Sequence, residues 1–174
     1  MHIKELGMIA AETGVNKDSV MLDSGTGSGA AALFFGHLCK KVYSYDIDAE
    51  NLKCAKENAE FLSISNIEFI NKNVYEGIEQ KDVDLIVFDL PEPWKAVEQA
   101  QKALKTGGVL VNYSLQVPQI QEFCNVLAKN ESFIILKTIE LIERDWKVEG
   151  LIARPSSEGI GHTGFLTFAR KVGG

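Results

Sequence analysis

Two kinds of hydrophobic pattern alternate along the chain. Short apolar runs predict strands at residues 19–23, 41–46, 67–71, 83–89 and 108–114, with two later runs at 133–142 and 164–169. Segments in which apolar residues recur every three or four positions predict helices at residues 3–13, 30–38, 49–61, 94–104 and 117–128. Regular alternation of the two patterns is typical of an α/β domain built on a mostly parallel sheet.

The alternation weakens after residue 130. The last two predicted strands are joined without a helix, through a segment at 150–161 that is rich in Gly, Ser and Pro. We therefore expect a Rossmann-like doubly wound sheet, mostly parallel, with a C-terminal antiparallel hairpin. With 174 residues and no linker, the chain is expected to form a single domain over 1–174. In such open sheets, ligands bind at the carboxyl ends of the strands.

A glycine-rich loop follows the first predicted strand. It reads Asp23-Ser24-Gly25-Thr26-Gly27-Ser28-Gly29 and leads into the helical segment at 30–38. Glycines let the backbone approach a ligand closely, and the helix N-terminus offers free N–H groups. The third glycine comes one residue earlier than in the dinucleotide fingerprint G-x-G-x-x-G, and no Gly-Lys-Ser/Thr follows as in a P-loop. The loop therefore predicts a cofactor site, with an NAD-type nucleotide-binding domain as an alternative.

Polar residues follow three further predicted strands. Asp46 ends the second strand, where a carboxylate can accept hydrogen bonds from both ribose hydroxyls. Asn73 follows the third strand, where it can meet an adenine amine or simply form a turn. Asp89 closes the apolar fourth strand, and a carboxylate beside a cofactor loop predicts a functional role. Trp94, a few residues on, either stacks on a base or packs beneath its own loop.

Charge and cysteine usage limit the function classes. The formal net charge is −6, whereas proteins that hold nucleic acid by charge alone are usually basic. Three cysteines (Cys39, Cys54 and Cys124) are too widely spaced for a disulfide framework or a CxxC zinc pattern. No apolar run reaches the roughly 18 residues of a membrane helix, and the first residues do not read as a secretory signal. We therefore expect a cytoplasmic protein with no membrane partner.

The loop and the acids together resemble the class I S-adenosylmethionine-dependent methyltransferases. In addition, DLPEPW at residues 89–94 is similar to the Asp-Leu-x-x-Pro-Trp motif of tRNA (adenine-N1)-methyltransferases of the archaeal and bacterial type. Further stretches match the same family, so the resemblance spans nearly the whole chain: MHIKELGMI (1–9), VYEGI (74–78), RDW (144–146), RP (154–155) and GHTGFL (161–166).

This resemblance implies S-adenosyl-L-methionine as the cofactor and N1 of an adenine in the tRNA T-loop as the methyl acceptor. It implies that Asp89 is catalytic, because it contacts the adenine N6 and orients N1 toward the methyl group, and that no metal is needed. The implied cofactor-binding residues are Asp23, Gly25, Thr26, Gly27, Gly29, Asp46, Asn73, Val74 and Asp89. The implied substrate-binding residues are Pro91, Trp94, Arg154 and His162, the last two at the RNA or at a subunit interface.

Two implications concern the whole protein. The family usually carries an N-terminal β-rich domain that helps to hold tRNA, and this chain starts where the catalytic domain begins, so we expect that domain to be absent. The family forms homotetramers, so we expect a homo-oligomer. Two alternative functions stay open: a small-molecule methyltransferase similar to the corrin-precursor enzymes, which lack DLPEPW, and a non-catalytic partner subunit of a tRNA methyltransferase. The intact loop with Asp46 and Asp89 argues against the non-catalytic alternative.

Overall fold

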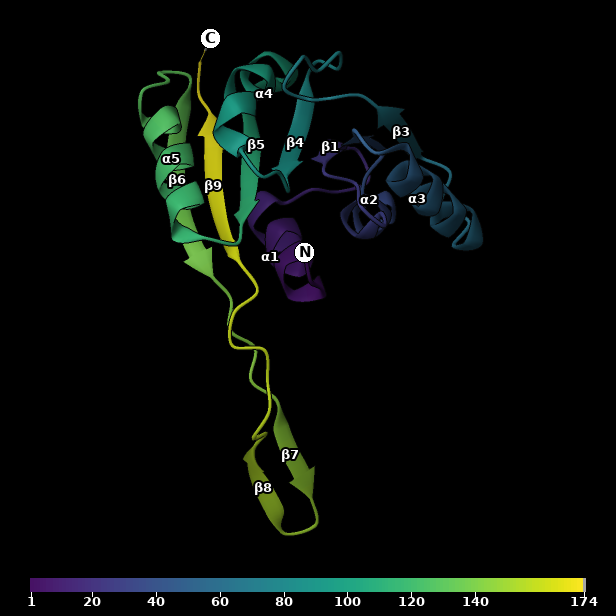
Figure 1. Cartoon of the computed structure of the whole chain (residues 1–174), viewed down its shortest axis with the longest axis vertical. Coiled ribbons are helices and arrows are strands. Elements are labelled where there is room, and N and C mark those ends of the chain that lie inside the picture. Colours follow the sequence, from purple (N-terminus) through teal and green to yellow (C-terminus); the bar gives the residue numbers. More distant parts are fainter. Residues whose placement is uncertain (174) are drawn as a thin grey trace.

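A computed structural model describes residues 1–173 as one seven-stranded sheet with helices on both faces and a separate two-stranded hairpin (Figure 1). The elements of the first half are α1 (Ile3–Thr13), β1 (Val20–Ser24), α2 (Ala30–Gly36), β2 (Lys41–Asp46), α3 (Ala49–Phe61) and β3 (Ile67–Asn71). Those of the second half are β4 (Val83–Phe88), η1 (Pro93–Ala96), α4 (Val97–Ala103), β5 (Leu104–Ser114), α5 (Val117–Ala128), β6 (Phe133–Glu140), β7 (Trp146–Glu149), β8 (Ile152–Pro155) and β9 (Phe165–Lys171).

The strand order determines where a ligand crevice can lie. Across the sheet the order is β3-β2-β1-β4-β5-β9-β6. The strands β1 to β5 pair in parallel, whereas β9 is antiparallel to both β5 and β6. The winding direction reverses between β1 and β4, so the carboxyl ends of these two strands flank the crevice of a doubly wound sheet. The expected Rossmann-like fold with an antiparallel C-terminal part is confirmed.

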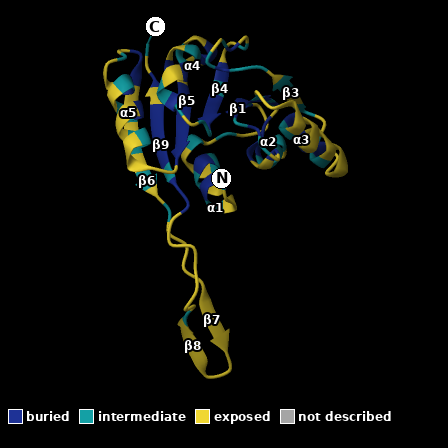
Figure 2. Ribbon diagram, in the orientation of Figure 1, coloured by how far each residue is buried: buried dark blue, intermediate teal, exposed yellow. Residues whose placement is uncertain are grey.

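Two apolar clusters hold the helices on the sheet. On one face, Leu6 and Ile9 of α1 and Phe35 of α2 pack against strand residues such as Val87 and Val111. On the other face, α4 and α5 pack against the strand residues in between, which point to the opposite side of the sheet and include Phe88 and Leu110. Successive strand side chains point to opposite faces, so a sheet covered on both sides requires continuous apolar strands. The apolar residues 85–88 of β4 satisfy this requirement, and Figure 2 shows the strand as mostly buried.

The structure corrects the predicted segment at 94–104. It begins as the 3-10 turn η1, and α4 ends at Ala103, so β5 begins four residues before the predicted strand at 108–114. The helix ends because Leu104 is extended and pairs with Val83 of β4, and the ammonium group of Lys171 donates hydrogen bonds to the carbonyls of Gln101 and Leu104 at this end. A helix leaves its last carbonyls unsatisfied, and a lysine is well suited to bond them.

The sequence pattern also missed the hairpin formed by β7 and β8, which we call the arm (residues 146–155). The predicted antiparallel pairing of the last two long strands is present between β6 and β9, but β9 also inserts next to β5. The arm lies within the connection between β6 and β9 and projects away from the sheet (Figure 1). Nearly all of its residues are exposed (Figure 2). Among the helices of residues 1–173, none is long and apolar enough to cross a bilayer.

Candidate active site

The glycine loop connects the ends of three parallel strands. The backbone amides of Gly25 and Thr26 both donate to the carbonyl of Tyr45 at the end of β2, at 3.0 and 3.2 Å. Gly25 has φ of 94°, and a Cβ atom at this position would overlap the carbonyl oxygen of Asp89 just beyond β4. A side chain at Gly25 is therefore excluded both by its backbone angle and by this close approach. The predicted loop and the backbone of the predicted catalytic residue Asp89 are direct neighbours.

Asp46 is fastened to the same loop. Its Oδ2 accepts hydrogen bonds from the amide of Gly27 at 3.0 Å and from the Nδ2 group of Asn51 at 3.2 Å. Its Oδ1 accepts from the amide of Asp48 at 2.9 Å, and Asp48 itself caps α3 by accepting from the Glu50 amide. The contacts hold the carboxylate beside the loop at the carboxyl end of β2, where the sequence analysis predicts a ribose site.

Asp23 is fully buried beneath the loop. Its Oδ2 accepts from the hydroxyl of Ser44 at 2.7 Å, and that hydroxyl lies 2.7 Å from the hydroxyl of Thr26. Its Oδ1 has no hydrogen-bond partner among the described residues. Burial raises the pKa of the carboxyl to about 7, because desolvation disfavours the charged form. An unpartnered carboxylate oxygen under a glycine loop fits a ligand with a cationic group, such as the ammonium of S-adenosylmethionine.

Asp89 stands at the mouth of the crevice. Its amide donates to the carbonyl of Ser24 at 2.9 Å, which continues the pairing of β1 and β4 beyond the last strand residue. Its side chain is about one third exposed, and one carboxylate oxygen lies 3.5 Å from the nitrogen of Met1. Burial raises the pKa of this carboxyl, and the nearby amino group of Met1 opposes the shift. Asp89 therefore combines access to a ligand with a fixed backbone position.

The start of α1 and the segment after the arm form a wall next to Asp89. The residue opposite Phe88 in the pairing of β4 and β5 is Asn112, so Asp89 lies beside Tyr113. The Tyr113 hydroxyl donates to the carbonyl of Thr163. Burial, together with the charges of Glu5 and Asp89, raises the pKa of Tyr113 to about 12, so this hydroxyl keeps its proton. No local sequence pattern marks Tyr113 or Glu5, because their partners are distant in the chain.

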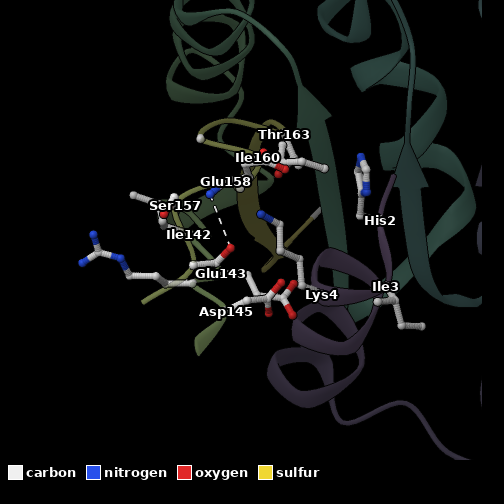
Figure 3. A pocket seen from close by; sticks show the side chains of 14 residues that line it. His2, Ile3, Lys4, Ile142, Glu143, Asp145, Ser157, Glu158, Ile160 and Thr163 are labelled. Atoms are coloured by element: carbon white, nitrogen blue, oxygen red, sulfur yellow. Dashed lines mark hydrogen bonds between the residues drawn. The ribbon is translucent and has the colours of Figure 1, made fainter. Parts of the chain in front are cut away.

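An adjoining cavity of about 490 Å³ lies between the start of α1 and the connections that lead to the arm (Figure 3). His2 and Lys4 line it from the side of α1, and Arg144, Ile160 and Thr163 line it from the other side. Lys4 spans the two sides, because its ammonium donates to the carbonyl of Leu141 at 2.8 Å. The cavity is therefore built from the first and last thirds of the chain.

The structure does not bring all predicted site residues to this crevice. The side chain of Asn73 accepts from the amide of Tyr75 at 3.0 Å, as expected of a turn, and Val74 is buried in the core. Trp94 packs against the core cluster on the α4 and α5 side. The carbonyl of Pro91 accepts from Gln119, which ties its loop to α5. The binding roles predicted for these residues remain predictions.

Two other predicted substrate residues lie farther toward the arm. Arg154 belongs to β8 and contacts Ser157, so it sits on the arm and not at the crevice. His162 lies where the chain returns from the arm, and its ring contacts Glu140 and the carbonyl of Leu115. Ile47, between Asp46 and Asp48 at the end of β2, is 73% exposed beside the predicted ribose site.

Comparisons with known proteins identify relatives of this chain. Residues 1–151 match the family described as tRNA methyltransferase complex GCD14 subunit. The chain is 36% identical to the tRNA (adenine(57)-N(1)/adenine(58)-N(1))-methyltransferase TrmI of Methanocaldococcus jannaschii, over 96% of this chain and 70% of the relative. It is 33% identical to a tRNA (adenine(58)-N(1))-methyltransferase TrmI of Thermus thermophilus, over 87% of this chain and 61% of the relative. A solved S-adenosylmethionine-dependent O-methyltransferase of Thermotoga maritima superposes with a TM-score of 0.95 at 28% identity, covering 99% of this chain and 66% of that one.

The fold and the loop with its acids define a class I S-adenosylmethionine-dependent methyltransferase. Within that class, the chain belongs to the GCD14 family of tRNA methyltransferases, because the family matches most of its length. The chain spans 61% to 70% of the length of the relatives described above.

Proposed function

We propose that this chain transfers the methyl group of S-adenosylmethionine to N1 of an adenine in the tRNA T-loop. The observation that carries the proposal is the position of Asp89: its backbone carbonyl lies against Gly25 of the cofactor loop, and its carboxylate is about one third exposed. The activity named for the curated relatives from M. jannaschii and T. thermophilus supports the choice of substrate. No metal is needed for this transfer, because N1 of adenine already carries a lone pair.

The residues around the glycine loop fit the parts of the cofactor. The loop backbone at Gly25, Thr26, Gly27 and Gly29 would cover its methionine part, and the free Oδ1 of Asp23 would face its ammonium group. Asp46 would accept the ribose hydroxyls, and Asn73 with Val74 would border the adenine. When bound, S-adenosylmethionine supplies an electrophilic methyl carbon whose bond to sulfur breaks with the electron pair going to sulfur.

Asp89 contributes by positioning and by charge. Its carboxylate would accept a hydrogen bond from the N6 amine of the target adenine, which turns N1 toward the methyl carbon. The N1 lone pair forms the new N–C bond, so the adenine ring becomes positively charged and no proton has to leave. A carboxylate at N6 stabilises that developing charge more strongly in the transition state than in the ground state. Pro91 and Trp94 would shape the entrance for the base.

An acidic chain requires help to hold RNA. With a net charge of −6, one copy attracts phosphates poorly, so we infer that the enzyme works as a homo-oligomer, a tetramer by family resemblance. The arm supports this inference, because an isolated two-stranded hairpin is marginally stable in water. His162 and Arg154 lie at or on the arm, where a subunit interface or bound RNA would meet them.

Three unpaired cysteines favour the reducing cytoplasm as the compartment.

The first experiment is methyl transfer from S-adenosylmethionine to unmodified tRNA, with the digested nucleosides identified by mass spectrometry. The proposal expects N1-methyladenosine in the T-loop. Methylation of a small molecule only, or of no substrate, would contradict it. The digested nucleosides identify the methylated base and atom, and mass spectrometry of oligonucleotide fragments from the same tRNA locates that base in the T-loop. Together these two readings separate tRNA methylation from the small-molecule alternative.

The variant Asp89→Ala tests the assigned chemistry. We expect the rate of methyl transfer to fall at least about 100-fold, because the interaction with the developing charge is lost. Calorimetric affinity for S-adenosylmethionine should stay within about threefold, because the loop and Asp46 remain. Asp18→Ala, at an exposed acid before β1 and outside the loop, is the control for loss of a negative charge. Equal losses of affinity and rate in Asp89→Ala would place this residue in the cofactor site alone.

A further inference from the structure

A buried hydrogen-bond pair joins the two ends of the chain next to the active site. Glu5 lies in the first turn of α1 and is completely buried, and Thr163 lies just before β9 and is 7% exposed. The Thr163 hydroxyl donates to Oε1 of Glu5, although the two residues are 158 positions apart. No step of the proposed reaction uses either side chain. Burying a carboxylate costs free energy even when its oxygens are hydrogen-bonded, so the burial of Glu5 suggests a role for the contacts that it makes.

Both oxygens of Glu5 accept hydrogen bonds from the two segments that line the cavity beside the site. Its Oε2 accepts from the amide of His2 at 3.0 Å, which fixes the chain at the start of α1. Its Oε1 accepts from Thr163, which fixes the chain that returns from the arm. The ammonium of Lys4 lies 3.8 Å from the same Oε1 and offsets part of its charge. His2, Lys4 and Thr163 line the cavity beside the site (Figure 3), so Glu5 ties together both of its sides.

Thr163 is held from the opposite side as well. Its carbonyl accepts from the hydroxyl of Tyr113, the neighbour of Asp89 on β5. The next residue, Gly164, packs so closely on the Tyr113 ring that a Cβ atom would overlap it. At the Glu5 end of the pair, the backbone nitrogen of Met1 lies 3.5 Å from the Asp89 carboxylate, and Met1 is two residues before the first turn of α1. The Glu5 and Thr163 pair is therefore connected on both sides to residues that border Asp89.

We propose that Glu5 and Thr163 are positioning residues for methyl transfer: their hydrogen bond fixes the wall of the site against which the target adenine must lie beside Asp89. This inference rests on the proposed function, and it adds which contacts hold the wall of the site in place beside Asp89. Without the bond, the start of α1 and the segment at 161–164 can separate, and the cavity loses its shape. The cofactor loop is held instead by its own hydrogen bonds to Tyr45 and Asp46, so cofactor binding should not depend on this pair.

The test compares four proteins in single-turnover methyl transfer to tRNA. Thr163→Val removes the hydroxyl and keeps the side-chain shape, whereas Thr163→Ser keeps the hydroxyl. We expect Thr163→Val to lower the rate at saturating tRNA at least about 20-fold, since a displacement near 1 Å costs up to about 100-fold. Thr163→Ser should restore the rate to within about threefold of the wild type. Thr138→Val is the matched control, because it breaks a hydroxyl pair with Thr167 at the distant sheet edge.

Two further measurements separate positioning from general damage. Calorimetric affinity of Thr163→Val for S-adenosylmethionine should stay within about threefold of the wild type, and its apparent KM for tRNA should change less than its kcat. Hydrogen exchange should accelerate in residues 1–6 and 161–164 but not in the glycine loop. Glu5→Gln should reproduce both effects in weaker form, because the amide can accept only through one oxygen.

The outcomes distinguish this inference from the proposed function. If the wild type methylates tRNA and Thr163→Val does so at the same rate, the pair has no positioning role while the function stands. A parallel loss of rate and cofactor affinity in Thr163→Val also overturns the inference, because it indicates a merely structural bond. If the wild type itself yields no N1-methyladenosine, the proposed function is wrong and the positioning role falls with it.

Discussion

Asp23 is fully buried beside the cofactor loop, and burial raises the pKa of its carboxyl from 3.8 to about 7. Between these two pH values, the folded chain keeps a proton that the unfolded chain has already lost. The free energy of unfolding therefore decreases as the pH rises from about 4 to about 7, by up to a few kcal/mol. Such an arrangement destabilises the free protein and favours a ligand whose positive charge can meet the carboxylate.

The variant Asp23→Asn tests this electrostatic cost. Its free energy of unfolding should fall less than that of the wild type between pH 4.5 and pH 8, by on the order of 2 kcal/mol or more. Urea unfolding at several pH values measures the difference, with Asp18→Asn as the surface control. Parallel pH curves for wild type and Asp23→Asn would show that the carboxyl titrates normally.

At the residue scale, the sequence correctly placed the loop and the acids at one edge of the sheet. The segment from Asp23 to Gly29 and the acids Asp46 and Asp89 lie at strand ends, and parallel strands necessarily bring those ends to one edge. The contact of Glu5 with Thr163 could not be found in this way. It depends on how β9 inserts between β5 and β6, which no local pattern encodes.

At the scale of elements, the chain is predictable where one periodicity persists. The bounds of α1, β2, α3, β3 and α5 match the predicted segments, because each has a clear apolar face or a buried run. The arm was missed because β7 and β8 are short and almost entirely exposed, so no buried face marks them. The start of β5 was misplaced because its first residue, Leu104, pairs with Val83 of β4 across a register shift, which no periodicity of the chain marks.

His162 joins three elements where the chain returns from the arm. Its Nδ1 lies 2.6 Å from the carboxylate of Glu140 at the end of β6, and its Nε2 lies 3.0 Å from the carbonyl of Leu115 after β5. Only the imidazolium can donate to both acceptors at once. The Glu140 hydrogen bond, followed by that to Leu115, raises the pKa of His162 above its ordinary value, and the charge of Lys4 opposes the shift.

This junction should depend on pH. The contribution of the imidazolium to stability is fully present below pH 6.5 and is lost as the pH rises through the higher pKa of the folded state. We expect proton NMR to give a pKa for His162 above 6.5, and Glu140→Gln to lower it. The stability difference between wild type and Glu140→Gln should shrink as the pH rises. An unchanged His162 titration in Glu140→Gln would contradict the assigned contact.

At the scale of the whole molecule, the arm has two chemically different faces. Paired residues of an antiparallel hairpin share a face, so Trp146 with Pro155 and Val148 with Ala153 form one apolar side. The opposite side carries Lys147 with Arg154 and Glu149 with Ile152. In the described chain, nothing covers the apolar side, where Val148 is 75% exposed. An apolar surface of this kind favours contact with another molecule, and the proposed homo-oligomer supplies one.

The arm therefore provides a test of assembly by paired lysine substitutions. Val148→Lys places an ammonium group on the apolar side and changes the charge by one. Glu149→Lys places the same group on the other side at a similarly exposed position and changes the charge by two, so it is the more severe change in charge. In sedimentation at equal micromolar concentrations, we expect the wild type and Glu149→Lys to form oligomers and Val148→Lys to shift toward monomers, because an interface core tolerates an unpaired charge poorly. Assembly of Val148→Lys like the wild type would place the contact elsewhere, and a monomeric wild type would refute the homo-oligomer itself. A monomeric wild type that still methylates tRNA would further show that one acidic copy holds the RNA without a groove shared between subunits.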